Sequence, residues 1–554
     1  MKKYIILLSS VLIVSCTSDE KYEDLNRDPN KPTQVSAESL FNASIKSLFD
    51  QMESPNINTN VFRLFSQYWT QTTYNDESNY DLNNRRVADN HYSEMYRDVL
   101  YDLKDAKSKV NTPNKIAMIS VLEVYTWQQL VDTYGNIPYS AALQGSLEPT
   151  PEYDDAKTIY EDLIVRINTA INTFSISGDA GFTSSDQIYG GNITQWLKFA
   201  NSVKFKLAMR IADVPSMTTL SQTNAEEAVI AGIFSSNADN ATLAYESNST
   251  NANPVWSDLV ESGRNDFVAA NTIVNYMNDI KDPRRVSYFD ENIKYSLGDI
   301  LAITNPTPPS TTTTIEFSST LITTPEIGDR VFRILPPGAD GIIPDPIFLG
   351  KISSFTTNTI SIINITAGNI VGDDLAFSRF LGGTYGAVNN FPAFSHIGTQ
   401  LKTQTFRGVL LDYAEIEFLL AEATERGYAV GGTAESHYNA GITASMNDWG
   451  IATADIATYL AQPSVAYTTA TGTWRQKIGF QFWLAMYNRG FEGWSVYRKY
   501  DAPIMNIAAV ANIPVPKRYT YPLREQTLNL SNYNAAVAAI GGDELDTPIF
   551  WDVN

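Results

Sequence analysis

The spacing of apolar residues changes twice along this chain, and that spacing limits the folds open to it. From about residue 39 to 290, and again from about 409 to 500, apolar side chains recur every three to four residues, as on one face of an α-helix. From Leu297 to about Phe380 the stripe is absent, and the sequence is rich in Thr, Ile, Ser and Pro. The pattern predicts a mainly α protein with a small all-β module inserted in it.

Two helices before residue 290 are especially clear. One ends at Gly135, and a proline follows shortly after, which is common punctuation at a helix C-terminus. The other has an apolar stripe from Trp196 to Ile211, with Asn192 and Gln195 spaced as a capping box at its start. Its stripe should face the core and its lysines the solvent: Lys198, Lys204 and Lys206.

The second helical block contains a pair of helices joined by a short turn. Residues 411–426 are apolar on almost every side, so this helix should be buried. A partner helix is expected over about 434–449, ending at Gly450. Helix pairs of this kind favour tetratricopeptide-like units, although the sequence matches that consensus poorly.

The intervening segment, 297–380, contains short stretches that alternate as half-buried strands do, with proline-rich turns between them. The expected strands are 314–317, 330–334, 359–362 and 373–377. Two roles for this β module stay open. It decorates a tolerant loop, or it contacts a ligand or a partner protein.

The N-terminus has the features of an export signal. Two lysines precede an apolar run, Tyr4–Val14, which is too short to span a bilayer. The run ends in Leu-Ile-Val-Ser-Cys, which resembles the lipobox of bacterial lipoproteins. The resemblance implies a signal peptide over 1–15, an acyl lipid on Cys16 as membrane anchor, and a tether over 16–38. The alternative is an ordinary secretory signal followed by a buried cysteine.

Two further features bear on location and chemistry. Asp19 and Glu20 follow the cysteine closely and resemble the surface-export signal of Bacteroidota lipoproteins, which implies the outer face of the outer membrane. Cys16 is the only cysteine, so neither an internal disulfide nor a cysteine metal cluster can form.

Composition and motifs exclude several functions. A formal charge of −21 argues against binding nucleic acid, because phosphates need basic partners. The three histidines lie far apart, and no zinc-protease, nucleophile-elbow or phosphate-loop motif is present. Acidic pairs such as Asp373-Asp374 are expected by chance among 61 acidic residues. We therefore expect no enzyme, no catalytic residue and no cofactor, whereas a calcium site stays open.

Several motifs, taken in order, resemble those of SusD/RagB-type nutrient-binding lipoproteins, in particular the SusD-like subgroup. They are Asn26-Arg27-Asp28-Pro29-Asn30, Tyr134-Gly135-Asn136-Ile137-Pro138-Tyr139, Trp196 through Ala212, Asp282-Pro283-Arg284, Gly493-Trp494-Ser495-Val496-Tyr497, and Pro516 through Asn529. The resemblance covers nearly the whole chain apart from 297–380. It implies a SusD-like helical domain formed by 39–296 and 381–554.

The resemblance also implies a function. Relatives of this kind sit as a hinged lid over a SusC-type TonB-dependent outer-membrane transporter. An oligosaccharide or an oligopeptide is caught between lid and barrel and then imported. The lid would contribute affinity and closure rather than covalent chemistry. A different function on the same fold stays open, an accessory or structural subunit of an outer-membrane assembly or export complex.

Two polar stretches are the candidate ligand-binding segments. The first combines aromatic rings with amide and hydroxyl groups, a mixture suited to sugars or peptide backbones: Trp69, Tyr74, Asn75 and Tyr80. The second is a tight loop that includes Arg264 and Asp266. The structural alternatives are a core position for Trp69 within a polar loop, and a helix-capping role for Asp266.

Overall fold

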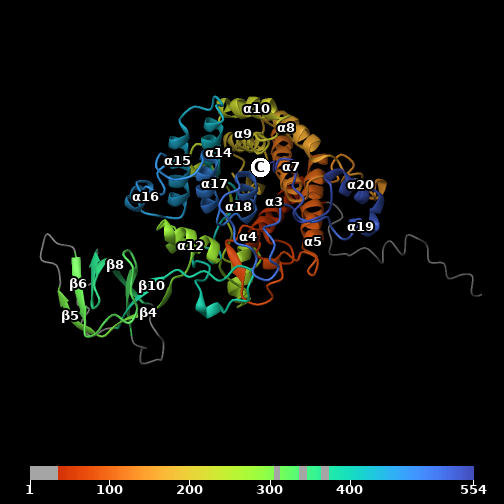
Figure 1. Ribbon diagram of the computed structural model, residues 1–554. Helices are drawn as coiled ribbons and strands as arrows, with labels where there is room; N and C mark the ends of the chain where they lie inside the picture. The colour runs from red at the N-terminus through yellow and green to blue at the C-terminus, as the bar shows by residue number, and fades with distance from the viewer. Residues whose placement is uncertain (1–34, 305–311, 336–345, 364–373, 554) are drawn as a thin grey trace, which may run out of the picture.

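The computed structural model describes residues 35–304, 312–335, 346–363 and 374–553. Figure 1 shows these residues as a large helical body with a small β module at one side. The predicted leader, the lipidation site Cys16 and the Asn26–Asn30 motif lie outside the described residues. The first helix, α3, begins at Ala37 within the predicted tether, and the side chain of Ser36 caps it.

The helical body is built mostly from consecutive helices that pack as neighbours. Its first half contains α3 (Ala37–Glu53), α4 (Phe62–Phe65), α5 (Val87–Ser93), α6 (Tyr101–Ser108), α7 (Pro113–Tyr134), α8 (Ala156–Thr173), α9 (Ile193–Arg210), α10 (Thr218–Ala231), α11 (Pro254–Trp256), α12 (Asn271–Asp279) and α13 (Arg285–Tyr288). Its second half contains α14 (Tyr413–Glu425), α15 (Ala434–Asp448), α16 (Thr453–Leu460), α17 (Trp474–Ala485), α18 (Gly490–Tyr500), α19 (Glu525–Leu528) and α20 (Leu530–Ile540).

The predicted helix ends are confirmed. Helix α7 stops at Gly135, which has a φ of +82°. The backbone amide of Gly135 donates a hydrogen bond to Val131 O at 2.8 Å and closes the last turn. Asn192 caps α9 by accepting a hydrogen bond from the Gln195 amide at 3.2 Å. The reciprocal half of the expected capping box is missing, because Gln195 Oε1 has no partner among the described residues.

The predicted pair of helices in the second block is also confirmed. Helix α14 is buried over most of its length, and α15 packs along it. Gly441 of α15 lets the two backbones approach, because a Cβ at that position would lie 3.0 Å from the Phe418 ring. The fold is therefore mainly α with packed helix pairs, as the apolar spacing predicts.

The expected outward position of the α9 lysines is wrong for two of the three. Lys198 is half-buried and pairs with Asp239 at 2.9 Å. Lys204 and Lys206 are buried, and Lys206 forms ion pairs with Glu415, at 3.1 Å, and with Glu492. Helix α9 packs against α7, α8, α10 and α14, so it has no broad solvent-facing side, and carboxylates from neighbouring helices neutralise its lysines.

The inserted module is a single seven-stranded antiparallel sheet with the strand order β4-β10-β7-β8-β9-β6-β5. Its strands are β4 (Asn292–Gly298), β5 (Ile300–Thr304), β6 (Thr312–Phe317), β7 (Arg330–Ile334), β8 (Ile347–Phe355), β9 (Thr359–Ile363) and β10 (Asp374–Arg379). The two edge strands, β4 and β5, are separated by Asp299 alone. The sheet must therefore curl until its edges lie near each other.

The curled sheet encloses its own hydrophobic core, separate from that of the helical body and built around Ile315, Phe317, Ile360, Ile362 and Phe377. All four predicted strands are present, whereas β4, β5 and β8 were not predicted. Strand β4 also starts at Asn292, five residues before the expected boundary at 297. Register shifts interrupt the pairing of β4, β5 and β8, which blurs the regular alternation that reveals a strand in sequence.

The module joins the helical body at one end. Asn292 pairs with Arg379, so the chain enters and leaves the sheet side by side. Asn278 Nδ2 of α12 donates a hydrogen bond to Phe380 O at 2.9 Å where the chain returns to the body. The segment that follows, 381–392, runs directly to the candidate site.

Candidate functional site

A two-stranded sheet brings the two predicted ligand-binding segments together. Strand β1 (Trp69–Gln71) pairs antiparallel with β3 (Phe267–Ala269), although nearly two hundred residues separate them. Beyond the last pair, the Thr72 amide donates to Asp266 O at 2.9 Å, and Thr72 Oγ1 donates to Asn265 O at 2.6 Å. The polar residues after β1 and those before β3 therefore lie against each other.

A third segment, 381–392, completes the site. Gly383 exchanges backbone hydrogen bonds with Ala269 and Asn271, each 2.8 Å long. Only glycine fits at the preceding position, because a Cβ on Gly382 would lie 2.3 Å from Asn271 Cα. Further along, the Asn389 amide donates to Thr72 O at 3.1 Å, and its side chain donates to Gln71 O at 2.9 Å. Segment 381–392 is thus fastened to both strands.

The three loops line a surface groove of about 560 Å³. We call it the loop groove, and its lining residues are Thr72, Thr73, Asn265, Asp266, Val388, Asn389, Asn390, Phe391 and Pro392. Hydroxyl, amide and carboxylate groups stand beside one aromatic and two aliphatic side chains. This volume and this mixture suit a short segment of a polar oligomer such as an oligosaccharide or a peptide.

Two predicted site residues lie in the core. The Trp69 side chain is 1% exposed, its Nε1 donates to Tyr487 Oη at 3.1 Å, and the Arg63 guanidinium lies 5.0 Å from its ring. Tyr80 is 2% exposed and packs edge-on against Phe65, and burial raises the pKa of its hydroxyl to about 12. Neither ring has an open face for a ligand in this structure.

The other four predicted residues lie at or beside the groove. Tyr74 is 70% exposed and has a φ of +47°, an uncommon conformation for a tyrosine that holds its ring out from the loop. Asn75 Nδ2 donates to Gly386 O at 2.6 Å. Arg264 Nε pairs with Asp266 Oδ2 at 2.5 Å. The structural alternative for Asp266, a helix-capping role, is wrong, because strand β3 follows it instead of a helix.

Sequence reasoning missed the contribution of residues 388–392. Phe391 stacks on His396, with ring centroids 3.7 Å apart, and this stack stiffens the groove wall. The run Asn389-Asn390-Phe391-Pro392 combines amides with an aromatic ring, as the two predicted stretches do. That composition was the available signal, but only the fold shows that the run lies beside Thr72.

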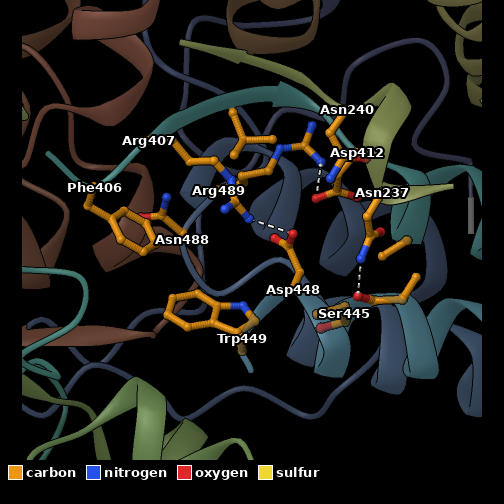
Figure 2. Close-up of a pocket in the computed structure, with 14 residues that line it drawn as sticks. Asn237, Asn240, Phe406, Arg407, Asp412, Ser445, Asp448, Trp449, Asn488 and Arg489 are labelled. Carbon is orange, nitrogen blue, oxygen red and sulfur yellow. Dashed lines mark hydrogen bonds and ion pairs between the residues drawn. The ribbon is translucent and has the colours of Figure 1, made fainter. Parts of the chain in front are cut away.

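A second cavity lies between α14, α15 and α17 and is shown in Figure 2. Its volume of about 30 Å³ is close to that of one water molecule. Its charges are paired internally, since Arg407 binds Asp448 at 2.5 Å and Arg489 Nη1 binds Asp412 at 3.2 Å. Asp412 also caps α14 through the Glu415 amide. This cavity is therefore a structural polar cluster and too small for an oligomeric ligand.

The described part of the chain offers no grouping of three or more His, Cys, Asp or Glu side chains suited to a metal ion. Nor does any helix in it combine the length and the apolar composition that crossing a bilayer requires.

The fold defines a class of protein, a mainly helical scaffold that carries the loop groove on its surface loops. The chain belongs to the SusD-like family described as "Starch-binding associating with outer membrane", whose model matches residues 29–322 and 363–522. The matched segments extend into the predicted insertion from both sides. The internal segment outside the family match is therefore 323–362, which is shorter than the expected 297–380.

Solved structures show the same fold. A chitin-binding protein is 22% identical, with a TM-score of 0.69, and the alignment covers 94% of this chain and 100% of that one. A chitin-binding SusD homologue from Flavobacterium johnsoniae is 22% identical, with a TM-score of 0.67 and coverages of 93% and 99%. A SusD homologue from Bacteroides thetaiotaomicron is 20% identical, with a TM-score of 0.68 and coverages of 94% and 100%. No curated protein matches the chain.

Proposed function

We propose that this protein is a surface-exposed outer-membrane lipoprotein that binds an oligosaccharide in the loop groove. It would serve as the lid of a SusC-type TonB-dependent transporter that imports the sugar. The observation that supports this most directly is the convergence of three polar, partly aromatic loops on one groove, in a chain whose family description is starch binding. Two structural relatives described as chitin-binding point to the same ligand class.

The chemistry of the groove favours a neutral ligand over a charged one. Its one lining carboxylate, Asp266, is already paired with Arg264, so the two charges offset each other. The remaining polar groups are hydroxyls and amides, which bind sugar hydroxyls and acetamido groups by hydrogen bonds. A peptide backbone presents similar donors and acceptors, so an oligopeptide is the competing ligand. Binding and release in such a site need no catalytic group, and we propose that the protein is not an enzyme.

Calorimetric titration of the purified chain with chitooligosaccharides, maltooligosaccharides and neutral oligopeptides tests the ligand class. Thr73→Arg places a long cationic side chain in the groove and should lower sugar affinity at least tenfold. Thr169→Arg is the matched control, since Thr169 is exposed on α8, outside the groove. Binding of peptides but not of sugars would overturn the oligosaccharide ligand. Equal affinities for the two variants would overturn the groove as the site.

The anchor and the partner need separate tests in a producing cell. Cys16→Ala should release the protein from the membrane fraction, because the acyl lipid is the proposed attachment. Protease added to intact cells should degrade the wild-type protein if it faces outward. Co-purification with a TonB-dependent barrel, together with a growth defect on the bound sugar after deletion, would support import. Co-purification with assembly factors and no nutrient phenotype would favour the accessory-subunit function instead.

A further inference from the structure

A second surface feature lies next to the loop groove. Residues 502–516 contain no charged side chain, in a chain with 40 basic and 61 acidic residues. Four aliphatic side chains on this segment point into solvent: Ile504 is 83% exposed, Val510 70%, Ile507 52% and Ile513 40%. We call residues 503–515 the rim loop. Exposed aliphatic side chains gathered on one short loop are unfavourable in water, and such a loop is typical of an interaction surface when the fold maintains it.

The rim loop is held in place by hydrogen bonds to the helical body. The Gln67 side chain binds both backbone groups of Asn506. Gln67 Oε1 accepts a hydrogen bond from Asn506 N at 2.9 Å, and Gln67 Nε2 donates one to Asn506 O at 2.6 Å. Tyr276 Oη donates to Ile504 O at 2.8 Å. The exposed side chains are therefore displayed on an ordered backbone, which lowers the entropic cost of docking.

The rim loop and the groove wall are in direct contact. The Ala509 amide donates to Tyr385 O at 3.1 Å, and a Cβ on Gly386 would lie 2.7 Å from Ala509 N. Two residues beyond Gly386, Val388 lines the groove and is 68% exposed. The rim loop and the groove wall are therefore adjacent, and each carries exposed aliphatic side chains, so a partner that covers one lies beside the other.

The chemistry of the rim loop distinguishes between possible partners. It contains no aromatic residue, so it offers no flat face for stacking on a sugar ring. It contains no Lys or Arg, so it has no attraction for anionic lipid headgroups, and it lacks the Trp and Tyr side chains typical of membrane interfaces. Aliphatic side chains without charge are complementary to an apolar protein surface.

We propose that the rim loop is a docking surface for the protein that closes over the groove, contacting it through uncharged aliphatic side chains. This inference rests on the proposed function, in which that protein is the outer-membrane transporter. Contact at the rim would place the partner directly over the bound ligand and exclude water around it. Since no charge takes part, the contact resists high salt, unlike docking through charged patches.

The test uses the full lipoprotein in its producing cells. Ile504→Glu/Val510→Glu places two charges on the rim loop, and Val165→Glu/Ile230→Glu is the matched control, with side chains 61% and 84% exposed on α8 and α10. We expect the rim variant to recover at least tenfold less TonB-dependent barrel from solubilised membranes than the control. Recovery with the wild type should be unchanged in 0.5 M NaCl (~3–5 Å screening length). Thermal unfolding and sugar affinity of the rim variant should equal those of the control.

The remaining outcomes overturn the proposal in distinguishable ways. Equal recovery of the barrel with both variants refutes the docking surface and leaves the lid function intact. A wild-type chain that binds sugar but recovers no barrel refutes the lid function together with this inference. Loss of sugar affinity in the rim variant would assign the loop to the ligand instead. The lipid-free Cys16→Ala chain is also mixed with phosphatidylethanolamine vesicles and floated. If it floats with the vesicles and the rim substitutions abolish this flotation, the rim loop binds lipid instead of a protein.

Discussion

Asn79 Nδ2 donates a hydrogen bond to Gly386 O at 2.8 Å. The oxygen of the same side chain accepts from the backbone amides of Val510, at 3.2 Å, and Ala511, at 2.9 Å. One asparagine thus joins the wall of the loop groove to the rim loop, and it uses both the donor and the acceptor of its amide. The position of one surface relative to the other depends on this side chain.

Asn79→Asp should loosen this junction. The substitution replaces the amide donor with an oxygen that faces the Gly386 carbonyl oxygen, so a hydrogen bond becomes a repulsion. We expect the free energy of unfolding to fall by about 1–3 kcal/mol and sugar affinity to fall several-fold. Denaturant unfolding and calorimetry measure the two effects. Asn172→Asp, an exposed change of the same charge on α8, should alter neither quantity. Unchanged affinity in Asn79→Asp would show that the junction does not support the groove.

Tyr74→Ala should weaken ligand binding without destabilising the fold. The ring is largely exposed, so its removal leaves no cavity, whereas a stacked sugar would lose roughly 1–2 kcal/mol, about 5- to 30-fold in affinity. Tyr74→Phe keeps the ring and should retain most of the affinity. Tyr101→Ala removes a tyrosine that is 51% exposed on α6 and serves as the control. A Tyr74→Ala protein with wild-type affinity would exclude this ring as a platform.

Trp69 should behave in the opposite way. Because its side chain is buried and its Nε1 is bonded to Tyr487, Trp69→Ala should cost roughly 3–5 kcal/mol of unfolding free energy. Trp69→Phe fills more of the space and should cost less. Any Trp69→Phe protein that folds should bind sugar with nearly the wild-type affinity per folded molecule. If affinity falls sharply while stability is unchanged, Trp69 contacts the ligand.

The sequence predicts the helical body well, because burial imposes a regular spacing on apolar residues. Helix α7 and the α14–α15 pair follow directly from that spacing and from the glycines that end or separate them. The prediction from sequence fails at Lys206, whose charged side chain was expected to face the solvent. The two carboxylates that neutralise it, Glu415 and Glu492, come from α14 and α18, more than 200 residues away. No local pattern indicates such a partner.

The candidate site was predictable only in part, because contacts between distant segments decide which of its side chains are accessible. The composition of residues 69–80 and 262–267 indicates recognition of polar ligands, but not which side chains remain accessible. Trp69 and Tyr74 look equivalent in sequence, yet one pairs within a buried strand and the other follows it in a loop. Residues 388–392 join the site through the hydrogen bonds of Asn389 to Thr72 and Gln71, which are contacts between distant segments.

Removing the β module should leave the helical body folded. Asn292 and Arg379 pair across the base of the sheet, so a short Gly-Ser linker from Glu291 to Phe380 can replace residues 292–379. The module's core is separate from that of the body, which should therefore keep its thermal unfolding temperature to within a few degrees. The deletion does remove Arg330 and Ser378, which are the two partners of the Glu291 carboxylate. Glu291→Gln is combined with the deletion so that this carboxylate is not left unpaired.

Sugar affinity of the shortened chain then distinguishes the two roles left open for the module. Unchanged affinity, with unchanged recovery of the transporter, indicates decoration of a tolerant loop. A loss of affinity without a loss of stability indicates that the module contacts the ligand. A chain that no longer folds would contradict the independence of the two cores.

Acid should destabilise the protein through His91. This ring is buried, its Nδ1 accepts a hydrogen bond from Gln51 Nε2 at 2.7 Å, and its Nε2 has no partner among the described residues. Burial lowers the pKa of His91 from 6.5 to about 3, so the folded protein keeps the ring neutral. Between these values the unfolded chain binds a proton that the folded chain does not. Stability is therefore fully present above pH 6.5 and falls as the pH is lowered towards 3.

The effect of His91 on acid stability can be compared with that of His437, whose pKa is shifted in the opposite direction. Lowering the pH from 6.5 to 4.5 should cost about 2–3 kcal/mol through His91 alone. His91→Gln should be less stable than the wild type at pH 7 but should lose this part of the acid dependence. Burial alone would lower the pKa of His437, but the hydrogen bond to Glu417 and the attraction of its charge together outweigh burial and raise the pKa. The contribution of His437 to stability is therefore present at low pH and is lost as the pH rises. His437→Gln should therefore leave the acid loss intact, and an equal change in both variants would exclude His91 as its source.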